Sequence, residues 1–190
     1  VLSFLVGATF VVALSACQPA TVPEVAQGPA FSVSFDASLS ESAQDGRLVV
    51  LLSSHEDDEP RFLVSNSADT QLIFGQNVEN WQGGDTVVVD HDAIGFPLKN
   101  LTHVPAGTYY AQALLNRYRD FHLSNGKVVS LSPDQGEGQR WNRKPGNFYS
   151  KPVQIVIGEA TNEVFELILD QEIPPIEPPA DTQYIKHIQM

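Results

Sequence analysis

The residue with the most specific chemical context in this sequence is Cys17, the single cysteine of the chain. It directly follows Leu14, Ser15 and Ala16, and residues 1–16 carry no charge. An apolar stretch that ends in small residues is typical of a secretory signal peptide and its cleavage site. Residues 1–16 are fewer than the about 20 apolar residues that a spanning helix needs. We therefore expect a signal peptide rather than a membrane-spanning anchor.

Residues 14–17 resemble the lipobox of bacterial lipoproteins, in which the peptidase cleaves before the cysteine and the thiol carries a diacylglycerol. The resemblance implies that Cys17 is lipidated and that the membrane is a partner through this lipid, since more than one acyl chain is needed for stable anchoring. The alternative is an incidental thiol in an ordinary signal peptide. Gln18 rather than Asp follows the cysteine, which resembles the outer-membrane sorting pattern. We expect a lipid-anchored cell-envelope protein at the outer membrane, facing the periplasm or the exterior.

Two acidic clusters contain a histidine and have the side-chain types of a metal site: residues 90–92 and residues 55–59. Neighbours in a strand point to opposite faces, so His91 cannot share a metal with both Asp90 and Asp92. We interpret residues 90–92 as a turn that ends a strand, and residues 55–59 as a solvated acidic loop. No glycine has a serine two positions later, so the Gly-x-Ser-x-Gly nucleophile elbow is missing. The sequence predicts no catalytic residue, no metal site and no cofactor.

A Gly-rich segment, residues 132–151, carries large aromatic side chains together with arginines: Arg140, Trp141, Arg143, Phe148 and Tyr149. Long irregular loops are uncommon in compact domains and are often functional. Because aromatic residues and arginine are typical interface anchors, we expect these five residues to contact another domain or a ligand such as a sugar ring. The alternative is that Trp141 packs back onto its own domain, since large aromatics are mostly buried.

The elements that must position these residues are strands. Residues 31–36 alternate apolar and polar side chains, which predicts a half-buried strand. Further segments rich in Val, Ile, Leu and aromatics lie between Gly, Pro, Asn and Asp clusters: residues 47–53, 61–64, 86–90, 108–118, 127–131, 153–157 and 163–169. Asn125-Gly126 predicts a hairpin that pairs residues 121–123 with 128–129. Many short strands and no capped helical period predict an all-β sandwich of two antiparallel sheets.

The expected organisation is a lipoprotein signal peptide (1–16), a flexible tether (17–30), a β-sandwich accessory domain (31–170), a Pro-rich linker (171–182) and the start of a following domain (183–190). The chain opens without Met or a basic segment and ends in an alternating stretch, so we expect a fragment of a longer protein. The net charge of −12 argues against a nucleic-acid partner, because phosphate contacts need clustered Lys and Arg.

Four stretches together resemble a known arrangement: residues 105–116 (PAGTYYAQALLN), 138–142 (GQRWN), 145–150 (PGNFYS) and 173–179 (IPPIEPP). They resemble the N-terminal region of secreted bacterial esterases that are similar to enterochelin-esterase-like α/β hydrolases. The resemblance runs from Phe31 to the C-terminus. It implies an immunoglobulin-like antiparallel β-sandwich followed by a hydrolase domain in the same polypeptide. The family's Ser-His-Asp/Glu set belongs to that hydrolase domain, so no residue here receives a catalytic role.

Three hypotheses for function follow. The first is a non-catalytic N-terminal β-sandwich module of a lipid-anchored esterase, which positions a downstream hydrolase domain at the cell envelope. The second is a free-standing envelope lipoprotein that binds a carbohydrate or a peptide through the loop around Trp141. The third is a purely structural envelope module.

Overall fold

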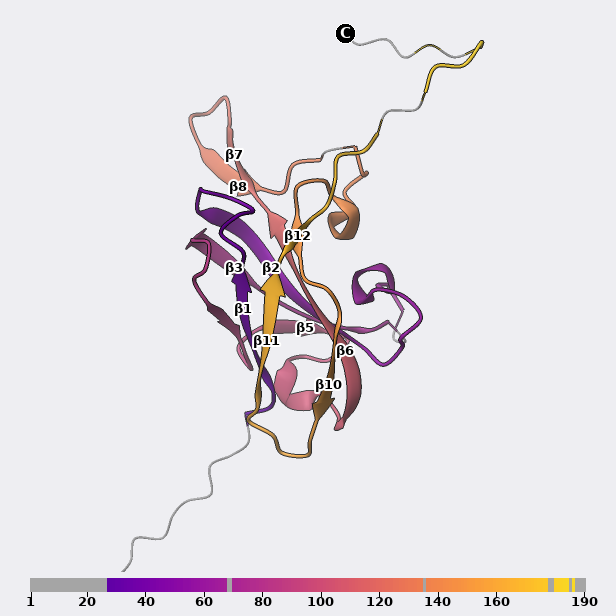
Figure 1. Ribbon diagram of the computed structural model, residues 1–190. Coiled ribbons are helices and arrows are strands. Elements are labelled where there is room, and N and C mark those ends of the chain that lie inside the picture. Colours follow the sequence, from indigo (N-terminus) through magenta and orange to yellow (C-terminus); the bar gives the residue numbers. More distant parts are fainter. Residues whose placement is uncertain (1–26, 68–69, 135, 178–179, 185, 187–190) are drawn as a thin grey trace, which may run out of the picture.

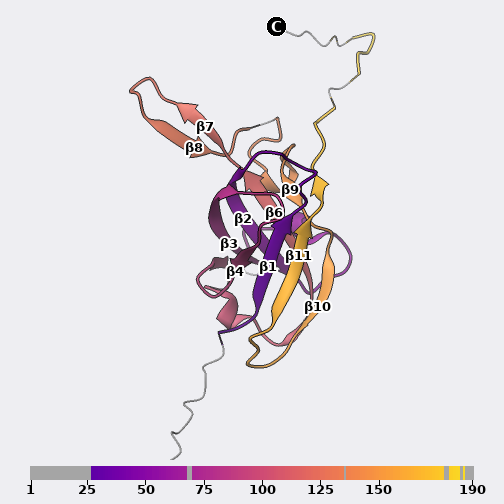
Figure 2. The same ribbon diagram turned by 60° about the vertical axis from the view of Figure 1, so that its left-hand side comes forward.

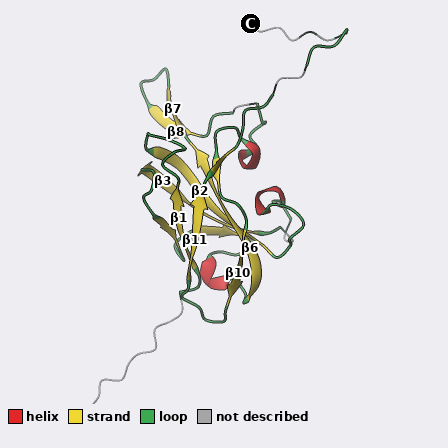
Figure 3. Ribbon diagram, in the orientation of Figure 1, coloured by secondary structure: helices red, strands yellow, loops and turns green. Residues whose placement is uncertain are grey.

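The computed structural model describes residues 27–67, 70–134, 136–177, 180–184 and 186. In this part of the chain, twelve strands accompany three 3₁₀ helices of one turn each: η1 (Pro60–Phe62), η2 (Leu101–His103) and η3 (Trp141–Arg143). Figure 3 shows how little of the fold is helical. No described helix is long and apolar enough to cross a membrane. Cys17, the expected signal peptide and most of the expected tether lie outside the described residues.

The smaller sheet has three strands in the order β11 (Val164–Leu169), β1 (Ala30–Phe35) and β4 (Val87–Val89). Strand β1 alternates between half-buried and buried residues along its whole length, as the sequence pattern predicts. It pairs antiparallel with β4 but parallel with β11. Among the described strands this is the one parallel pair, and the expectation of purely antiparallel sheets was wrong there.

The larger sheet has six strands in one path, and a seventh strand pairs with β6 beside it. Its order is β12 (Gln171–Glu172), β9 (Phe148–Tyr149), β6 (Gly107–Arg117), β2 (Gln44–Ser53), β3 (Leu72–Trp81) and β5 (Ile94–Phe96), and the additional strand is β10 (Val153–Ile157). The long strands β2, β3 and β6 are antiparallel neighbours and form its centre.

The two sheets face each other, as Figure 1 and Figure 2 show from two sides. One apolar core lies between them. Phe31, Val33 and Phe35 of β1 are buried in the same cluster as Leu48 and Val50 of β2. Burial of each large apolar side chain contributes about 1.5–3 kcal/mol, so this interface is the main source of stability. The protein is an all-β sandwich, as the sequence predicts.

The outer face of the larger sheet is also buried over part of its area. Leu51 and Leu114 have no exposed surface although they alternate with core residues and point away from the smaller sheet. The loop that follows β2 lies over this face, because the Arg61 N–H donates to Gln112 Oε1. The loop that follows β8 also lies over it, because Trp141 lines a cavity there. These two loops form a partial third layer.

Strands β7 (Arg119–His122) and β8 (Val128–Leu131) form a hairpin that projects from the sandwich (Figure 1, Figure 2). Phe121 pairs with Val129 and His122 with Val128, which confirms the predicted pairing. Gly126 adopts a φ of 81°, in the left-handed region that glycine enters without a steric penalty.

One predicted strand was wrong, and the strands β3, β5, β9 and β12 were not predicted. Residues 61–64 were expected to form a strand, but η1 occupies residues 60–62. Pro60 begins this turn, and proline lacks the N–H that a strand ladder requires. Conversely, β3 was missed although Leu72, Phe74 and Val78 follow a period of two, because Gln76 interrupts the apolar face. The other expected strands are confirmed with small shifts at their ends.

The expected domain boundaries also move. Gln171 and Glu172 pair with Tyr149 and Phe148, and Ile173 is buried, so the first residues of the expected linker belong to the sandwich. At the other end, the Gln27 N–H donates to Asn162 Oδ1 at 2.8 Å, so residues 27–30 of the expected tether are docked on the domain.

Candidate functional site

The five residues expected to form one contact surface lie in different environments. Phe148 is fully buried in the core, 5.7 Å from Phe35 between ring centroids, so its assignment to a contact surface was wrong. Arg140 is exposed, and Arg143 is exposed with its guanidinium 4.7 Å from the Phe62 ring. Of the five, Trp141 alone lines a cavity on the outer face of the larger sheet.

Tyr149 belongs to a buried clamp around Arg61. The Arg61 guanidinium lies 4.1 Å from the centroid of the Phe62 ring and 4.2 Å from that of Tyr149. Its Nε donates to Glu59 Oε2 at 2.7 Å, and its Nη1 donates to the Asn142 carbonyl at 3.0 Å. A planar guanidinium suits this arrangement because it can stack and donate at the same time. Arg61 therefore joins η1 to η3.

Gln112 extends this network into the centre of the sheet. Its Oε1 accepts from the Arg61 N–H at 3.0 Å, and its Nε2 donates to Glu59 Oε2 at 2.8 Å and to the Ser150 carbonyl at 2.9 Å. Burial raises the pKa of Glu59, but hydrogen bonds from Arg61 and Gln112 outweigh this and leave the pKa lowered. Residues 55–58 are exposed, as expected for a solvated loop, while Glu59 is half-buried as the counterion of Arg61.

A second buried network joins the loop formed by residues 132–147 to the end of β6. Lys144 Nζ donates to the Arg117 carbonyl at 2.5 Å and to Ser132 Oγ at 2.9 Å. Asn147, which is fully buried, donates to the Trp141 carbonyl at 2.7 Å and accepts from the Arg117 N–H at 3.0 Å. Buried polar groups that are satisfied in this way favour one arrangement of the loop.

We predict a pH dependence of stability from Lys144. Burial lowers its pKa to about 8 from the ordinary 10.5, so between these values the unfolded chain binds more protons than the folded one. The free energy of unfolding should therefore rise with pH above about 8, by at most about 1.4 kcal/mol per pH unit. Urea unfolding at pH 7 to 9.5 should show this rise relative to Lys144→Met. Parallel curves for the two proteins would contradict it.

The pH range of this measurement ends below pH 10, because the ionisation of tyrosine changes the free energy of unfolding in the opposite direction. Burial raises the pKa of Tyr109, so its phenol ionises first in the unfolded chain and stability is lost at higher pH.

The cavity that contains Trp141 is a groove of about 410 Å³, here called the Trp141 groove. Its lining residues are Arg47, Val49, Val64, Ser65, Asn66, Ile73, Phe96, Asn116, Tyr118 and Trp141. Arg47 and Asn116 are directly opposite on β2 and β6, and Ile73 is opposite Phe96 on β3 and β5. The floor is thus the outer face of the larger sheet, while Trp141 of η3 and residues 64–66 form walls.

Polar side chains of the groove form only some of the hydrogen bonds that they can make with the described residues. Asn116 Oδ1 accepts from Ser132 Oγ at 2.9 Å and from Asn147 Nδ2 at 3.2 Å, which orients its amide nitrogen. None of the described residues accepts a hydrogen bond from that nitrogen. Arg47 Nη1 donates to Asn77 Oδ1 at 3.2 Å, which holds the guanidinium across the sheet. The groove therefore combines aromatic surfaces with fixed, planar hydrogen-bond donors.

Gly75 makes room for this placement of Arg47. A Cβ at residue 75 would stand 3.1 Å from Arg47 Nε and 3.1 Å from the Leu48 carbonyl oxygen. Sequence reasoning found Trp141 but missed Arg47, Phe96, Asn116 and Tyr118, because the sequence does not reveal the register that brings four strands together. The period-2 pattern of β3 was the signal that could have located the floor.

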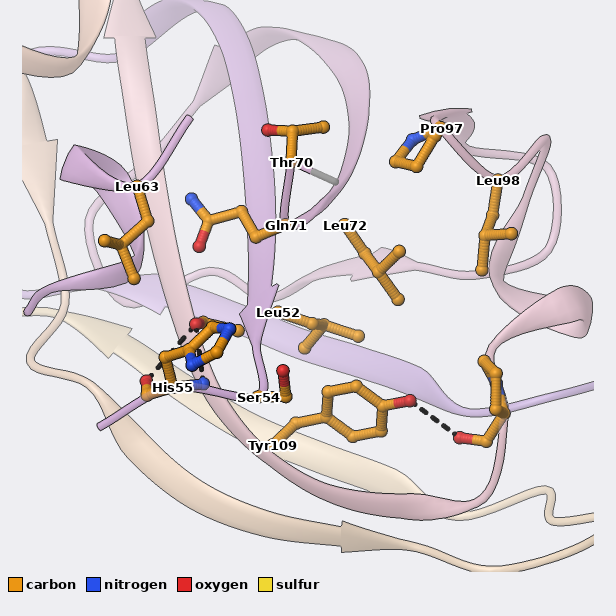
Figure 4. A pocket seen from close by; sticks show the side chains of 12 residues that line it. Leu52, Ser54, His55, Leu63, Thr70, Gln71, Leu72, Pro97, Leu98 and Tyr109 are labelled. Carbon is orange, nitrogen blue, oxygen red and sulfur yellow. Dashed lines mark hydrogen bonds between the residues drawn. The ribbon is translucent and has the colours of Figure 1, made fainter. Parts of the chain in front are cut away.

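A second cavity, of about 550 Å³, lies beside the start of β3, and Figure 4 shows its lining. Leucine and proline side chains form much of it, and the Tyr109 hydroxyl donates to the Pro105 carbonyl at 3.0 Å. Gln71 Nε2 donates to the Pro60 carbonyl, while Gln71 Oε1 is buried without a partner. This oxygen has almost no exposed surface, although Gln71 lines the cavity.

The remaining reactive side chains do not assemble. Among the described residues, no three His, Cys, Asp or Glu side chains are placed to hold a metal ion. The Asp92 N–H donates to Asp90 Oδ1 at 3.0 Å, which gives the predicted turn after β4. In the same part of the chain, no serine hydroxyl is bonded to a histidine ring. Thr102 Oγ1 lies 3.1 Å from His103 Nδ1, but both are exposed on η2.

Comparison with known proteins gives no relative: no family model, curated protein or solved structure matches this chain.

Proposed function

We propose that this sandwich is the non-catalytic N-terminal module of a lipid-anchored esterase, and that it positions an α/β-hydrolase domain of the same polypeptide at the cell envelope. The resemblance of residues 105–116, 138–142, 145–150 and 173–179 to such esterases supports the proposal. A positioning module must hold the outgoing chain in a defined direction. The contacts of Ile173 are the observation that carries the proposal.

Both backbone polar groups of Ile173 are hydrogen-bonded to the domain. Its N–H donates to the Asn147 carbonyl at 2.9 Å, and its carbonyl accepts from the Gly146 N–H at 2.8 Å. The side chain is 7% exposed, and Pro174 and Pro175 follow directly. Proline fixes φ near −65°, so the direction set at Ile173 continues into the next residues.

The exit segment also lies along the Gly-rich loop. A Cβ at Gly136 would stand 3.5 Å from Ile176 Cδ1, so Ile176 is beside this loop, and it is 52% exposed. In the proposal, Ile176 and the exposed Arg140 contact the hydrolase domain. Trp141 lies on the side of the same loop that lines the Trp141 groove. The proposed contact with the hydrolase domain and the groove are therefore separate surfaces.

Ester hydrolysis tests the proposal. The polypeptide encoded by the complete reading frame should hydrolyse short-chain p-nitrophenyl esters, while residues 17–190 alone should not. A reading frame without a Gly-x-Ser-x-Gly hydrolase after Met190 would overturn the proposal. Glycine in place of Pro174 and Pro175 should leave hydrolysis unchanged but broaden the distance distribution in small-angle scattering, because glycine removes the restriction on φ.

Lipid anchoring is tested separately. Cys17→Ser should move the protein from the membrane fraction to the soluble fraction, because the proposed acyl chains are its hold on the bilayer. The matched control is Ser15→Thr, which retains the cysteine. Persistent membrane association of the Cys17→Ser protein would contradict anchoring through this residue.

A further inference from the structure

We infer that the Trp141 groove is a binding site for a short segment of neutral oligosaccharide. This inference goes beyond the proposed positioning role, and no esterase activity is needed for it. The groove volume of about 410 Å³ is within the usual range for small-molecule sites.

The chemistry of the lining suits a sugar ring. Trp141 of η3, Phe96 of β5 and Tyr118, which lies between β6 and β7, provide aromatic rings around one floor. Phe96 is 50% exposed, so its ring is accessible to a ligand in the groove. A pyranose presents apolar C–H faces and a rim of hydroxyl groups, so it can stack on aromatic rings while its hydroxyls take hydrogen bonds from the sides.

The planar donors are in place for those hydroxyls. The Asn116 amide nitrogen is oriented by the two bonds to its own oxygen, and the Arg47 guanidinium is held by Asn77. Preorganised donors bind without the entropy loss of ordering a free side chain. Asn66, exposed on the wall, provides a further amide.

A peptide suits the groove less well because the central strands of its floor are paired on both sides. Strand β2 is paired with β3 and β6 on its two sides, β3 is also paired with β5, and β6 is also paired with β9 and β10. Extended peptides gain most of their affinity by adding a strand to an open edge. Among the described strands of the floor, only β5 is paired on one side alone, and it has three residues.

The charge of the lining residues further restricts the class of ligand. The chain has a net charge of −12, yet no acidic side chain is among the described residues that line the groove, and Arg47 is the one charged residue among them. The described lining offers no carboxylate that would attract a cation, and its arginine already donates to a neutral amide. A neutral ligand with many hydroxyl groups matches this balance.

Isothermal titration calorimetry of the purified chain with cello-, xylo-, malto- and chito-oligosaccharides tests the inference. At least one series should bind at concentrations up to about 10 mM, which detects dissociation constants in the millimolar range. Trp141→Ala and Phe96→Ala should each weaken that binding by at least about tenfold, since stacked aromatics are typical hot spots.

Phe121→Ala is the matched control, because this aromatic residue lies on the projecting hairpin and should leave the affinity unchanged. Thermal melts of each variant separate lost binding from lost folding, and Phe96 provides a second, exposed test if Trp141→Ala unfolds. No binding to any series, binding that survives both groove variants, or selective binding of unstructured peptides would overturn the inference. The ester assay is independent of these outcomes.

Discussion

Replacing Arg61 with alanine is expected to lower the free energy of unfolding by about 2–4 kcal/mol. Arg61 is 7% exposed, and its removal leaves Glu59 without its cation and the Asn142 carbonyl without its donor. Breaking a buried ion pair by removing one partner costs about 3–5 kcal/mol. The expected value is slightly smaller because the Glu59 side chain is 34% exposed.

Urea unfolding followed by tryptophan fluorescence would measure this loss. Arg143→Ala is the matched control, since Arg143 also lies over the Phe62 ring but is exposed, and its cost should stay below about 1 kcal/mol. Equal costs for the two substitutions would show that the Arg61 network does not hold the outer loops on the sheet. Limited proteolysis should also cut the loop 132–147 faster in Arg61→Ala.

Phe148→Ala is expected to destabilise the fold by about 3–5 kcal/mol, the usual cost of deleting a buried phenylalanine. The ring has no exposed surface and packs 5.7 Å from Phe35, and the Arg117 guanidinium lies 4.5 Å from its centroid. A cavity here would open between β9 and the smaller sheet. The exposed loop above could not collapse into it without breaking the bonds of Asn147.

The same unfolding measurement checks this prediction. Phe121→Ala removes the same side-chain volume from the half-buried hairpin and should cost less than about 1 kcal/mol. If Phe148→Ala were as mild as Phe121→Ala, residue 148 would belong to a contact surface after all, as its sequence context first indicated.

Local sequence patterns predicted what depends on neighbours along the chain. The alternation in residues 31–36 located β1, and Asn125-Gly126 located the β7–β8 hairpin and its pairing. The predicted turn after β4 depends on the Asp90 side chain and the N–H two residues later. Such features depend on side-chain period and on φ preferences, which a few residues determine by themselves.

The candidate site was much less accessible to sequence reasoning. Trp141 stood out by its loop, but its partners Arg47, Phe96 and Tyr118 are separated from it by 20 or more residues along the chain. Phe148 and Tyr149 are neighbours in sequence with the same aromatic character. One is in the core and the other clamps Arg61, because adjacent strand residues point to opposite faces.

The sequence by itself determined the all-β class, the strand positions that follow a clear period of two, and the chemical inventory from which any site is built. The tertiary structure alone decided the parallel pairing of β1 with β11, the burial of Arg61 and Lys144, and the assembly of the Trp141 groove. The physical reason is that these features depend on strand register and on loops folded over a distant sheet face. Their energies come from contacts between residues far apart in sequence, which local propensities do not encode.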